Sequence, residues 1–403
     1  MDYISAWRPS SFVVWSRWRR VGGAPFMTEH QRGRKRRSIK TNNASSSATV
    51  SDVARLAHVS TATVSRALNT PDVVRLEVRE RIAAAVEKLG YIPNDSARAL
   101  RQNQTRLIGV VVPTLSYALY ADFFASLQGT LAQDGYFALL TTSDYDLHSE
   151  AEHAIKLIRQ GAQGLVLVGR LREKRLANFL AASGIPHVST YVTDPTDNEN
   201  IIGFDNARAI REAVEHLVSL GHRRIAMLSG VTTKQNDRAI ARVNGFRIAT
   251  QIHQLPSESW IAEAPYTIEG GRLALRAILA RGLEPTALVC GSDMLAIGAL
   301  QECKARGIHV PRDISIVGFD DLEIAAHLDP PLSTVEVPSV EMGKAAGEHI
   351  IALCSRAPAP EKTIFETRLV IRKTTAKPRS REIITQRASR RRTPSDLLVF
   401  SSS

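Results

Sequence analysis

The 403-residue sequence contains only three cysteines, Cys290, Cys303 and Cys354, and none of them forms a CxxC pair. This odd number at wide spacing excludes a disulfide framework and a cysteine-based zinc site, and it fits a reducing cytoplasm. Long apolar runs are also missing, because LIGVVV and GLVLVG have the length of a strand and not the roughly 20 residues of a membrane span. We therefore expect a cytoplasmic protein with no membrane partner and no exported form.

The motifs that mark common enzyme classes are absent as well. The chain has no GxGxxG, no GxxxxGK[ST], no HExxH and no GxSxG. His148 and His153 flank SEAE, but their spacing places them on different faces of a helix. Asp144 and Asp146 are expected to cap a loop rather than to form a catalytic pair. The sequence thus predicts no enzyme, no cofactor and no metal site.

Basic residues exceed acidic ones, with 52 Lys and Arg against 40 Asp and Glu, a net charge of +12. Such an excess is typical of proteins that bind nucleic acids or anionic membranes. Nearly all of it lies at the two ends of the chain, since residues 1–48 and 376–403 hold 17 basic and 4 acidic side chains. Both ends lack periodicity and are predicted to be disordered, and Met27 is an alternative start.

Residues 49–90 have the pattern of three short helices. Ser51 is expected to cap a helix DVARLAH, with Leu56 among its inward residues, and a tight turn at His58 to Ser60 leads to a second helix, TATVSRAL. A third helix, 76–89, ends at Gly90. Two short helices joined by a tight turn predict a helix-turn-helix unit.

The second of these helices has an outward face suited to DNA. Val64, Ala67 and Leu68 are predicted to face inward, while Thr61, Ala62 and Arg66 face outward near its beginning. Arg66 can bond a guanine edge, and Thr61 and Ala62 offer a hydroxyl, methyl groups and little bulk. Short donors suited to phosphates lie beside them, namely Ser60, Thr63, Ser65 and Asn69.

Beyond residue 106 the pattern changes to strands alternating with helices. We expect nine strands, from RLIGVVVP to STVEVP, and one late strand within IFETRLVIRKT. Amphipathic helices lie between them, at 123–133, 151–159, 207–220, 272–279 and 294–304. This alternation predicts an α/β fold with two doubly wound parallel-sheet subdomains.

Long ordered motifs now connect the chain to a known family. ATVSDVARLAHVSTATVSRALN and VRERIAAAVEKLGYIPNDSARALR closely resemble the headpiece of the LacI/GalR family of bacterial transcription regulators, and LGHRRIAMLSG, SDMLAIGAL and VPRDISIVGFDD extend the resemblance. It implies a helix-turn-helix headpiece with a hinge helix (49–105, hinge about 94–101). It also implies an effector-binding and dimerisation core like a type I periplasmic binding protein (106–375), between a basic extension (1–48) and a basic tail (376–403).

The resemblance assigns DNA-binding roles by position. Thr61, Ala62 and Arg66 match base-reading positions, and Leu100 matches the wedge that a paired hinge helix inserts into the minor groove. Asn94 or Asp95 caps that hinge, which is too short to be stable alone. The expected phosphate contacts come from the polar residues Thr49, Ser60, Thr63, Ser65, Asn69 and Asn94.

The same resemblance implies an effector site between the core subdomains, at the carboxyl ends of the strands. The matching positions are Tyr120, Arg242, Tyr266 and Asp320, together with Ser292 or Asp293. A guanidinium, a carboxylate and tyrosine rings suit a sugar or sugar acid. Two alternatives stay open, in which Asp293 or Asp320 caps the helix that follows it, or Arg242 forms an interdomain ion pair.

The expected protein is a homodimeric repressor of a carbohydrate-utilisation operon in the bacterial nucleoid. Its expected partners are palindromic operator DNA and a small carbohydrate or sugar-acid effector. The alternative is a carbohydrate-binding protein of transport or chemoreception, which would require export and no headpiece. The tail lacks the apolar heptad helix of tetrameric relatives, so a dimer is predicted.

Overall fold

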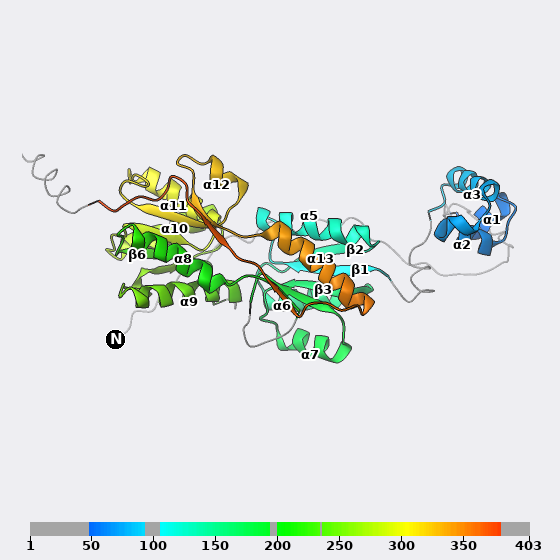
Figure 1. Cartoon of the computed structure of the whole chain (residues 1–403), viewed down its shortest axis with the longest axis horizontal. Helices are drawn as coiled ribbons and strands as arrows, with labels where there is room; N and C mark the ends of the chain where they lie inside the picture. The colour runs from blue at the N-terminus through cyan, green and yellow to red at the C-terminus, as the bar shows by residue number, and fades with distance from the viewer. Residues whose placement is uncertain (1–47, 93–104, 194–199, 234–235, 380–403) are drawn as a thin grey trace, which may run out of the picture. The chain divides into compact units, whose positions relative to one another are not determined.

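The computed structural model describes residues 48–92, 105–193, 200–233 and 236–379. The chain divides into two compact units, Met1–Pro93 and Asn94–Ser403, which are described separately below and drawn in Figure 1. The predicted hinge helix, with Asn94 and Leu100, lies outside the described residues, and so do most of the two basic ends.

The first unit is a small helical headpiece. It contains α1 (Val50–Leu56), α2 (Thr61–Asn69), a 3-10 turn (Pro71–Val73) and α3 (Leu76–Leu89). These elements enclose one small apolar core made of Val53, Ala54, Ala57, Val64, Ile82 and Ala85. The inward positions predicted for Leu56 and Leu68 are wrong, because these side chains are 38% and 39% exposed. Three short helices cannot cover both faces of α1 and α2. The small side chains of Ala54, Ala57 and Ala85 make the contacts between the helices instead.

The headpiece helices begin and end at residues that satisfy free backbone groups. Thr49, and not the predicted Ser51, caps α1: its side chain accepts from Asp52 N, and the Asp52 carboxylate accepts from Thr49 N at 3.0 Å. This reciprocal pair satisfies more donors than a single serine cap would. Ser60 caps α2 through Thr63 N at 3.1 Å. Gly90 ends α3 in the left-handed conformation (φ 58°), as predicted.

In the described part of the second unit, the core, the strands form two sheets of six, which confirms the α/β prediction. The first sheet has the order β11-β5-β4-β3-β1-β2 and the second has the order β12-β10-β9-β8-β6-β7. The strands of the first sheet are β1 (Leu107–Val112), β2 (Phe137–Thr142), β3 (Ala162–Val168), β4 (His187–Thr190), β5 (Ile201–Gly203) and β11 (Lys362–Ile364). Those of the second are β6 (Ile225–Ser229), β7 (Ile261–Glu263), β8 (Ala287–Cys290), β9 (Ser315–Asp320), β10 (Ser333–Glu336) and β12 (Arg368–Val370).

Helices cover both faces of each sheet because alternate strand residues are apolar on both sides. On the first sheet, Val110 packs toward α5 (Ala118–Gln133) and α13 (Ser339–Ser355), which lie side by side in Figure 1. Its neighbour Val111 packs toward α6 (Leu147–Arg159) and α7 (Lys174–Ser183). Each subdomain is therefore a three-layer sandwich.

The second sheet repeats this arrangement. Met227 packs toward α8 (Asn206–Ser219) and α9 (Asp237–Ile252), whereas Leu228 packs toward α10 (Ile268–Ala280) and α11 (Asp293–Ala305). A 3-10 turn (Glu258–Trp260) and the short α12 (Glu323–His327) complete the described elements.

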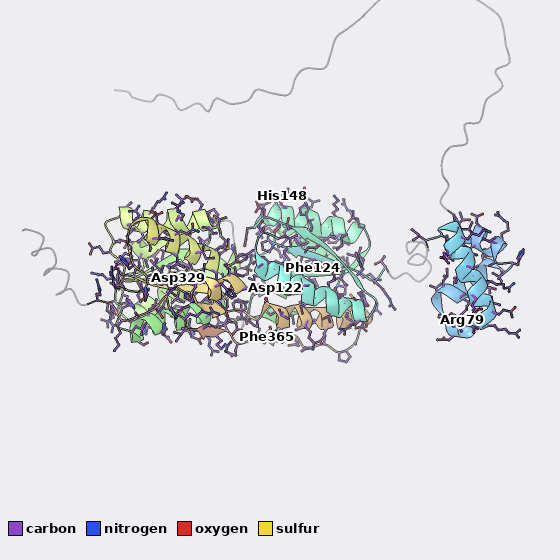
Figure 2. All side chains as sticks on the ribbon, turned by 90° about the horizontal axis from the view of Figure 1, so that it is seen from above. Arg79, Asp122, Phe124, His148, Asp329 and Phe365 are labelled. Atoms are coloured by element: carbon purple, nitrogen blue, oxygen red, sulfur yellow. The ribbon has the colours of Figure 1, made fainter. Side chains whose placement is uncertain are left out.

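The late part of the chain differs from the prediction. The single strand expected in IFETRLVIRKT is two short strands, because β11 pairs with β5 in the first sheet and β12 pairs antiparallel with β10 in the second. Phe365, labelled in Figure 2, lies in the segment between them and donates its N–H to Gly203 O at 2.8 Å. The chain thus crosses between the subdomains after β5, after β10 and after β11.

Smaller corrections concern the ends of elements. The strand β7 was not predicted, and α5, α6 and α10 begin four or five residues before the predicted starts. The first turns of α6 and α10 contain polar residues or glycines, which hide the helical periodicity there, whereas the first turn of α5 is apolar and buries Leu119 and Tyr120. The predicted tail is also ordered at its start, since Ala376 N donates to the Ser315 hydroxyl at 3.0 Å.

Candidate functional site

The headpiece presents the predicted base-reading residues on its surface. Thr61, Ala62 and Arg66 are all exposed on α2, from its first turn onward. None of the three contributes to the apolar core, so their side chains are available to a partner. Their role in reading bases stays a prediction.

Most of the predicted phosphate-binding residues have local hydrogen bonds as well. The Ser60 and Thr63 hydroxyls lie 2.9 Å apart, and the Asn69 side chain donates to Ser65 O at 2.7 Å. Thr49 belongs to the capping box of α1. These bonds fix the side chains at both ends of α2, and at its beginning the free backbone N–H groups and hydroxyls suit a phosphate.

The core brings four of the six predicted effector residues to one cavity. Tyr120 lies on α5, Arg242 on α9, Tyr266 just before α10 and Asp320 at the end of β9, and all four line the same cavity. Its other lining residues are Tyr117, Leu119, Tyr145, Tyr191, Asn236 and Arg238. Both subdomains contribute, and we refer to this set as the tyrosine cleft.

The other two predicted residues lie behind the cleft and have structural contacts. Ser292 caps α11 by accepting from Leu295 N at 3.2 Å. The Asp293 carboxylate accepts from Leu322 N at 2.8 Å and from the Thr334 hydroxyl at 2.6 Å, and its burial raises its pKa to about 7. Neither of them lines the tyrosine cleft, and the alternative that Asp293 caps α11 is wrong because Ser292 does so.

Arg242 is fully buried against neutral groups. Its guanidinium donates to Asn206 Oδ1 at 2.8 Å and to Gly291 O at 2.6 Å, and it stacks on the Phe319 ring at 3.9 Å from the centroid. Among the described residues it has no carboxylate partner, so the predicted alternative of an interdomain ion pair does not hold there. Burial lowers its pKa from the ordinary value.

Asp320 is also buried and incompletely bonded. The Tyr117 hydroxyl, from the other subdomain, donates to its Oδ2 atom, while its Oδ1 atom has no partner among the described residues. Burial raises its pKa well above the ordinary value, which favours the protonated form. It does not cap the following helix, because α12 begins after Leu322 without a side-chain cap.

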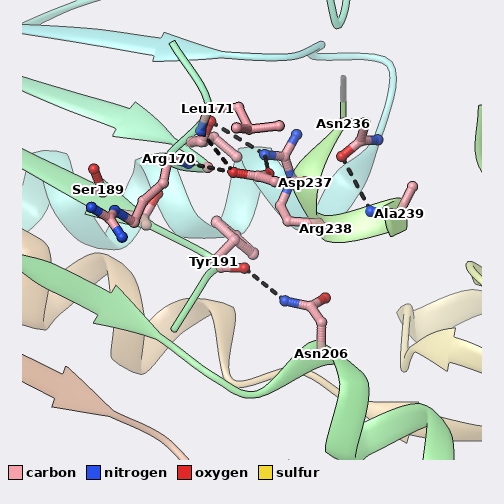
Figure 3. A network of polar contacts seen from close by, with 12 residues as sticks. Arg170, Leu171, Ser189, Tyr191, Asn206, Asn236, Asp237, Arg238 and Ala239 are labelled. Atoms are coloured by element: carbon pink, nitrogen blue, oxygen red, sulfur yellow. Dashed lines mark hydrogen bonds and ion pairs between the residues drawn. The ribbon is translucent and has the colours of Figure 1, made fainter. Parts of the chain in front are cut away.

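A second contact between the subdomains adjoins the cleft and is shown in Figure 3. The Asp237 carboxylate, in the first turn of α9, accepts from the backbone N–H groups of Arg170 and Leu171, at 2.5 and 3.0 Å. It also pairs with Arg238 at 2.6 Å, and Arg238 donates to Val168 O. We call this set the Asp237 junction.

The Asp237 junction depends on a glycine at the end of β3. Gly169 has φ +84°, and a Cβ atom there would lie 2.0 Å from Arg238 Nη1. Below it, Arg172 donates to Gly169 O at 2.6 Å and pairs with the buried Glu150 at 3.3 Å. The turn is therefore held from both sides in one conformation.

Sequence reasoning missed Tyr117, Tyr145, Tyr191 and Arg238. Tyr145 and Tyr191 have left-handed backbones (φ 59° and 63°), and each follows the carboxyl end of a strand. That position could have revealed them, because the ends of parallel strands meet at one edge of a sheet. Asp146, expected to cap a loop, instead caps the helix α6 by accepting from Ser149 N at 2.9 Å.

Within the described ranges, no group of three or more His, Cys, Asp or Glu side chains is placed to hold a metal ion. His148, labelled in Figure 2, instead pairs with Glu152 and Glu173 at 3.6 and 3.3 Å. No helix of the described part has the length and apolar character needed to cross a membrane.

Comparisons with known proteins identify both units. The family described as "Bacterial regulatory proteins, lacI family" matches residues 49–94, and "Periplasmic binding protein-like domain" matches residues 214–375. The transcriptional regulator MalR of Streptomyces coelicolor is 33% identical over 81% of this chain and 96% of its own length. The ribose operon repressor of Haemophilus influenzae is 32% identical over 75% of this chain and 91% of its own length.

Solved structures agree with these sequence relatives. The Lac repressor dimer bound to operator and an anti-inducer matches with a TM-score of 0.74 and 29% identity, over 82% of this chain and 100% of that one. The transcriptional regulator CelR in complex with cellobiose matches with a TM-score of 0.60 and 27% identity, over 81% and 99%. The chain belongs to the LacI family of bacterial transcriptional regulators.

Proposed function

We propose that this regulator is a homodimeric repressor of a carbohydrate-utilisation operon, which acts at the nucleoid in the cytoplasm without catalysing a reaction. Its operator affinity depends on a small sugar or sugar acid bound in the tyrosine cleft. The observation that carries the proposal is the cleft itself, in which both subdomains contribute polar and aromatic side chains around unpaired buried atoms.

DNA binding is assigned to the exposed face of α2 and to the hinge. Thr61, Ala62 and Arg66 read bases in the major groove, and Leu100 of the hinge at 94–101 is the minor-groove wedge. Two copies of the chain then bind the two halves of a palindrome. The proposed domains are a headpiece with hinge at 49–105 and a core at 106–375, and the charged ends add affinity that depends on salt and not on base sequence.

Effector control follows from the two-subdomain core. A ligand in the cleft contacts both subdomains at once and therefore binds with different affinity to open and closed arrangements. Operator affinity changes by that difference, commonly a factor of about 5 to 150. The related Lac repressor was solved with operator and anti-inducer, and CelR with cellobiose, which supports a sugar-like effector here.

In vitro selection from random duplex DNA tests the proposal. The full-length protein is expected to enrich a palindrome, and Arg66→Ala should weaken binding to that palindrome by roughly 1–3 kcal/mol with little change for random DNA. Arg81→Ala, at an exposed position of α3, is the matched control. Failure to enrich any sequence would contradict the regulator assignment and favour the binding-protein alternative.

A further inference from the structure

The tyrosine cleft contains two buried guanidinium groups one helical turn apart. Arg238 and Arg242 lie on the same face of α9, and both line the cavity. Their relative exposures are 8% and 6%, so neither charge is screened well by bulk water. A buried cation requires a partner. The net charge of the cleft therefore depends on which groups pair with these two arginines.

Arg242 has no negatively charged partner among the residues that the structure describes. Its two hydrogen bonds go to the neutral oxygens of Asn206 and Gly291. Its Nη2 group makes no hydrogen bond within the described residues. The charge of Arg242 is therefore left for a ligand to neutralise.

Arg238 shares its partner with the backbone. Asp237 pairs with Arg238 Nη1, but the same carboxylate also accepts from the N–H groups of Arg170 and Leu171. The Nε and Nη2 groups of Arg238 have no partner among the described residues. The Asp237 junction thus holds Arg238 in place while several of its N–H donors stay available.

The other described polar groups of the cleft are neutral hydroxyls, one amide and one carboxyl group, and the Tyr191 hydroxyl already donates to Leu119 O at 3.3 Å. Burial raises the pKa of Tyr120, Tyr145 and Tyr191, so these hydroxyls keep their protons. The Tyr266 hydroxyl has no partner, and Asn236 already uses its oxygen to cap α9. Asp320 is the one carboxyl group that lines the cavity, and it accepts from Tyr117 and makes no ion pair among the described residues.

An anionic ligand fits such a cleft better than a neutral sugar does. A neutral sugar would leave the buried charge of Arg242 without a counter-charge, because its partners among the described residues are neutral. Carboxylate and phosphate groups bring acceptors only, and planar guanidinium groups bind them through paired bonds. We propose that the effector of this regulator is an anion, a carboxylate or phosphate on a sugar-like skeleton, whose charged group binds Arg238 and Arg242. This inference rests on the proposed function of the cleft.

Four compounds with one carbon skeleton test the proposal with the full-length protein. D-glucose is neutral, D-glucuronate and D-gluconate carry a carboxylate in cyclic and open-chain form, and D-glucose 6-phosphate carries a phosphate. Thermal shift at millimolar ligand, followed by calorimetry, should show at least one anion binding roughly tenfold or more tightly than D-glucose. The order of the anions separates a carboxylate effector from a phosphate effector.

Substitutions in α9 test whether Arg238 and Arg242 bind the anion. Arg242→Gln keeps a donor but removes the charge, and it should weaken binding of the preferred anion by roughly tenfold while leaving weak D-glucose binding nearly unchanged. The double variant Asp237→Asn with Arg238→Gln removes both charges of the Asp237–Arg238 pair. It should weaken binding of the anion without leaving an unpaired buried charge. Arg247→Gln is the matched control, because Arg247 lies on the same helix but pairs with the exposed Glu258.

The outcomes separate this inference from the proposed function. D-glucose binding as tightly as its acids, or no thermal shift with any of the three anions, would overturn the anionic effector. Equal losses for neutral and charged ligands in Arg242→Gln would do the same. Selection of a palindromic operator is measured without ligand, so its success or failure concerns the proposed function alone.

Discussion

Asp320→Asn is expected to stabilise the core. The carboxyl group is only 3% exposed, and its Oδ1 atom has no hydrogen-bond partner among the described residues. An asparagine keeps the acceptor for the Tyr117 hydroxyl and tolerates the unusual backbone at this position, where φ is 116°. The substitution therefore removes a charge that the fold does not pair.

The size and sign of the effect follow from the raised pKa of Asp320. A carboxyl group whose folded pKa exceeds its unfolded value binds its proton more tightly in the folded state. Folding stability therefore falls as pH rises from about 3.9 toward the folded pKa, at ~1.4 kcal/mol per pH unit. Asp320 thus costs at most about 4 kcal/mol at pH 7. The amide N–H groups of asparagine gain no acceptor in return, so we expect a net stabilisation of about 2 kcal/mol.

Urea unfolding of the full-length protein between pH 4 and pH 8 measures this difference. Subtracting the two pH profiles isolates Asp320 from Asp293, whose pKa is also raised, to about 7. Asp313→Asn is a control of opposite sign, because hydrogen bonds from Arg312 lower the Asp313 pKa to about 2. Its contribution is present above about pH 4 and is lost as pH falls toward 2. If Asp320→Asn destabilised the core at pH 7, the carboxylate would be ionised and paired in solution, and our explanation would be refuted.

Three further substitutions test other parts of the structure. Thr49→Ala removes the capping box and should destabilise α1 by about 1 kcal/mol, measured as faster amide exchange of its first turn, whereas unchanged exchange would contradict the cap. Gly169→Ala places a Cβ atom against Arg238 and should lower core stability by about 2 kcal/mol in urea unfolding, so a wild-type midpoint would mean that the turn adapts. Leu100→Ala should weaken operator binding much more than binding to random DNA in gel shifts, and equal losses would contradict the wedge.

The regular features of the fold could be predicted from the sequence because they depend on local patterns. Strand and helix alternation in residues 107–337 predicted the two sheets, and Gly90 predicted the end of α3. The late segment could not be predicted in the same way. The segment 362–374 is apolar enough for one strand, but only the positions of β5 and β10 in space divide it into β11 and β12.

The cleft shows the same limit for individual side chains. The resemblance to a known family placed Tyr120, Arg242, Tyr266 and Asp320, and all four line one cavity. Tyr117, Tyr145 and Tyr191 come from different loops, and their sequence neighbours carry no common motif. Leu68 fits the helical period of α2, yet none of the described headpiece residues covers it fully. Periodicity indicates which face of a helix is apolar, but it does not indicate how much protein packs against that face.

Energetically unfavourable features of the core are concentrated at the tyrosine cleft, so the cleft lowers the stability of the fold. Tyr145, Tyr191 and Asp320 have positive φ angles, and each lines the cavity. Tyr266 Oη and Asp320 Oδ1 are buried there without a hydrogen-bond partner among the described residues. Backbone strain and unpaired polar atoms persist only where the surrounding structure holds them in place. Here the three crossovers and the Asp237 junction hold the strand ends together. A ligand that satisfies these atoms stabilises the closed arrangement of both subdomains at once, which is the physical requirement for an effector that changes the shape of the core.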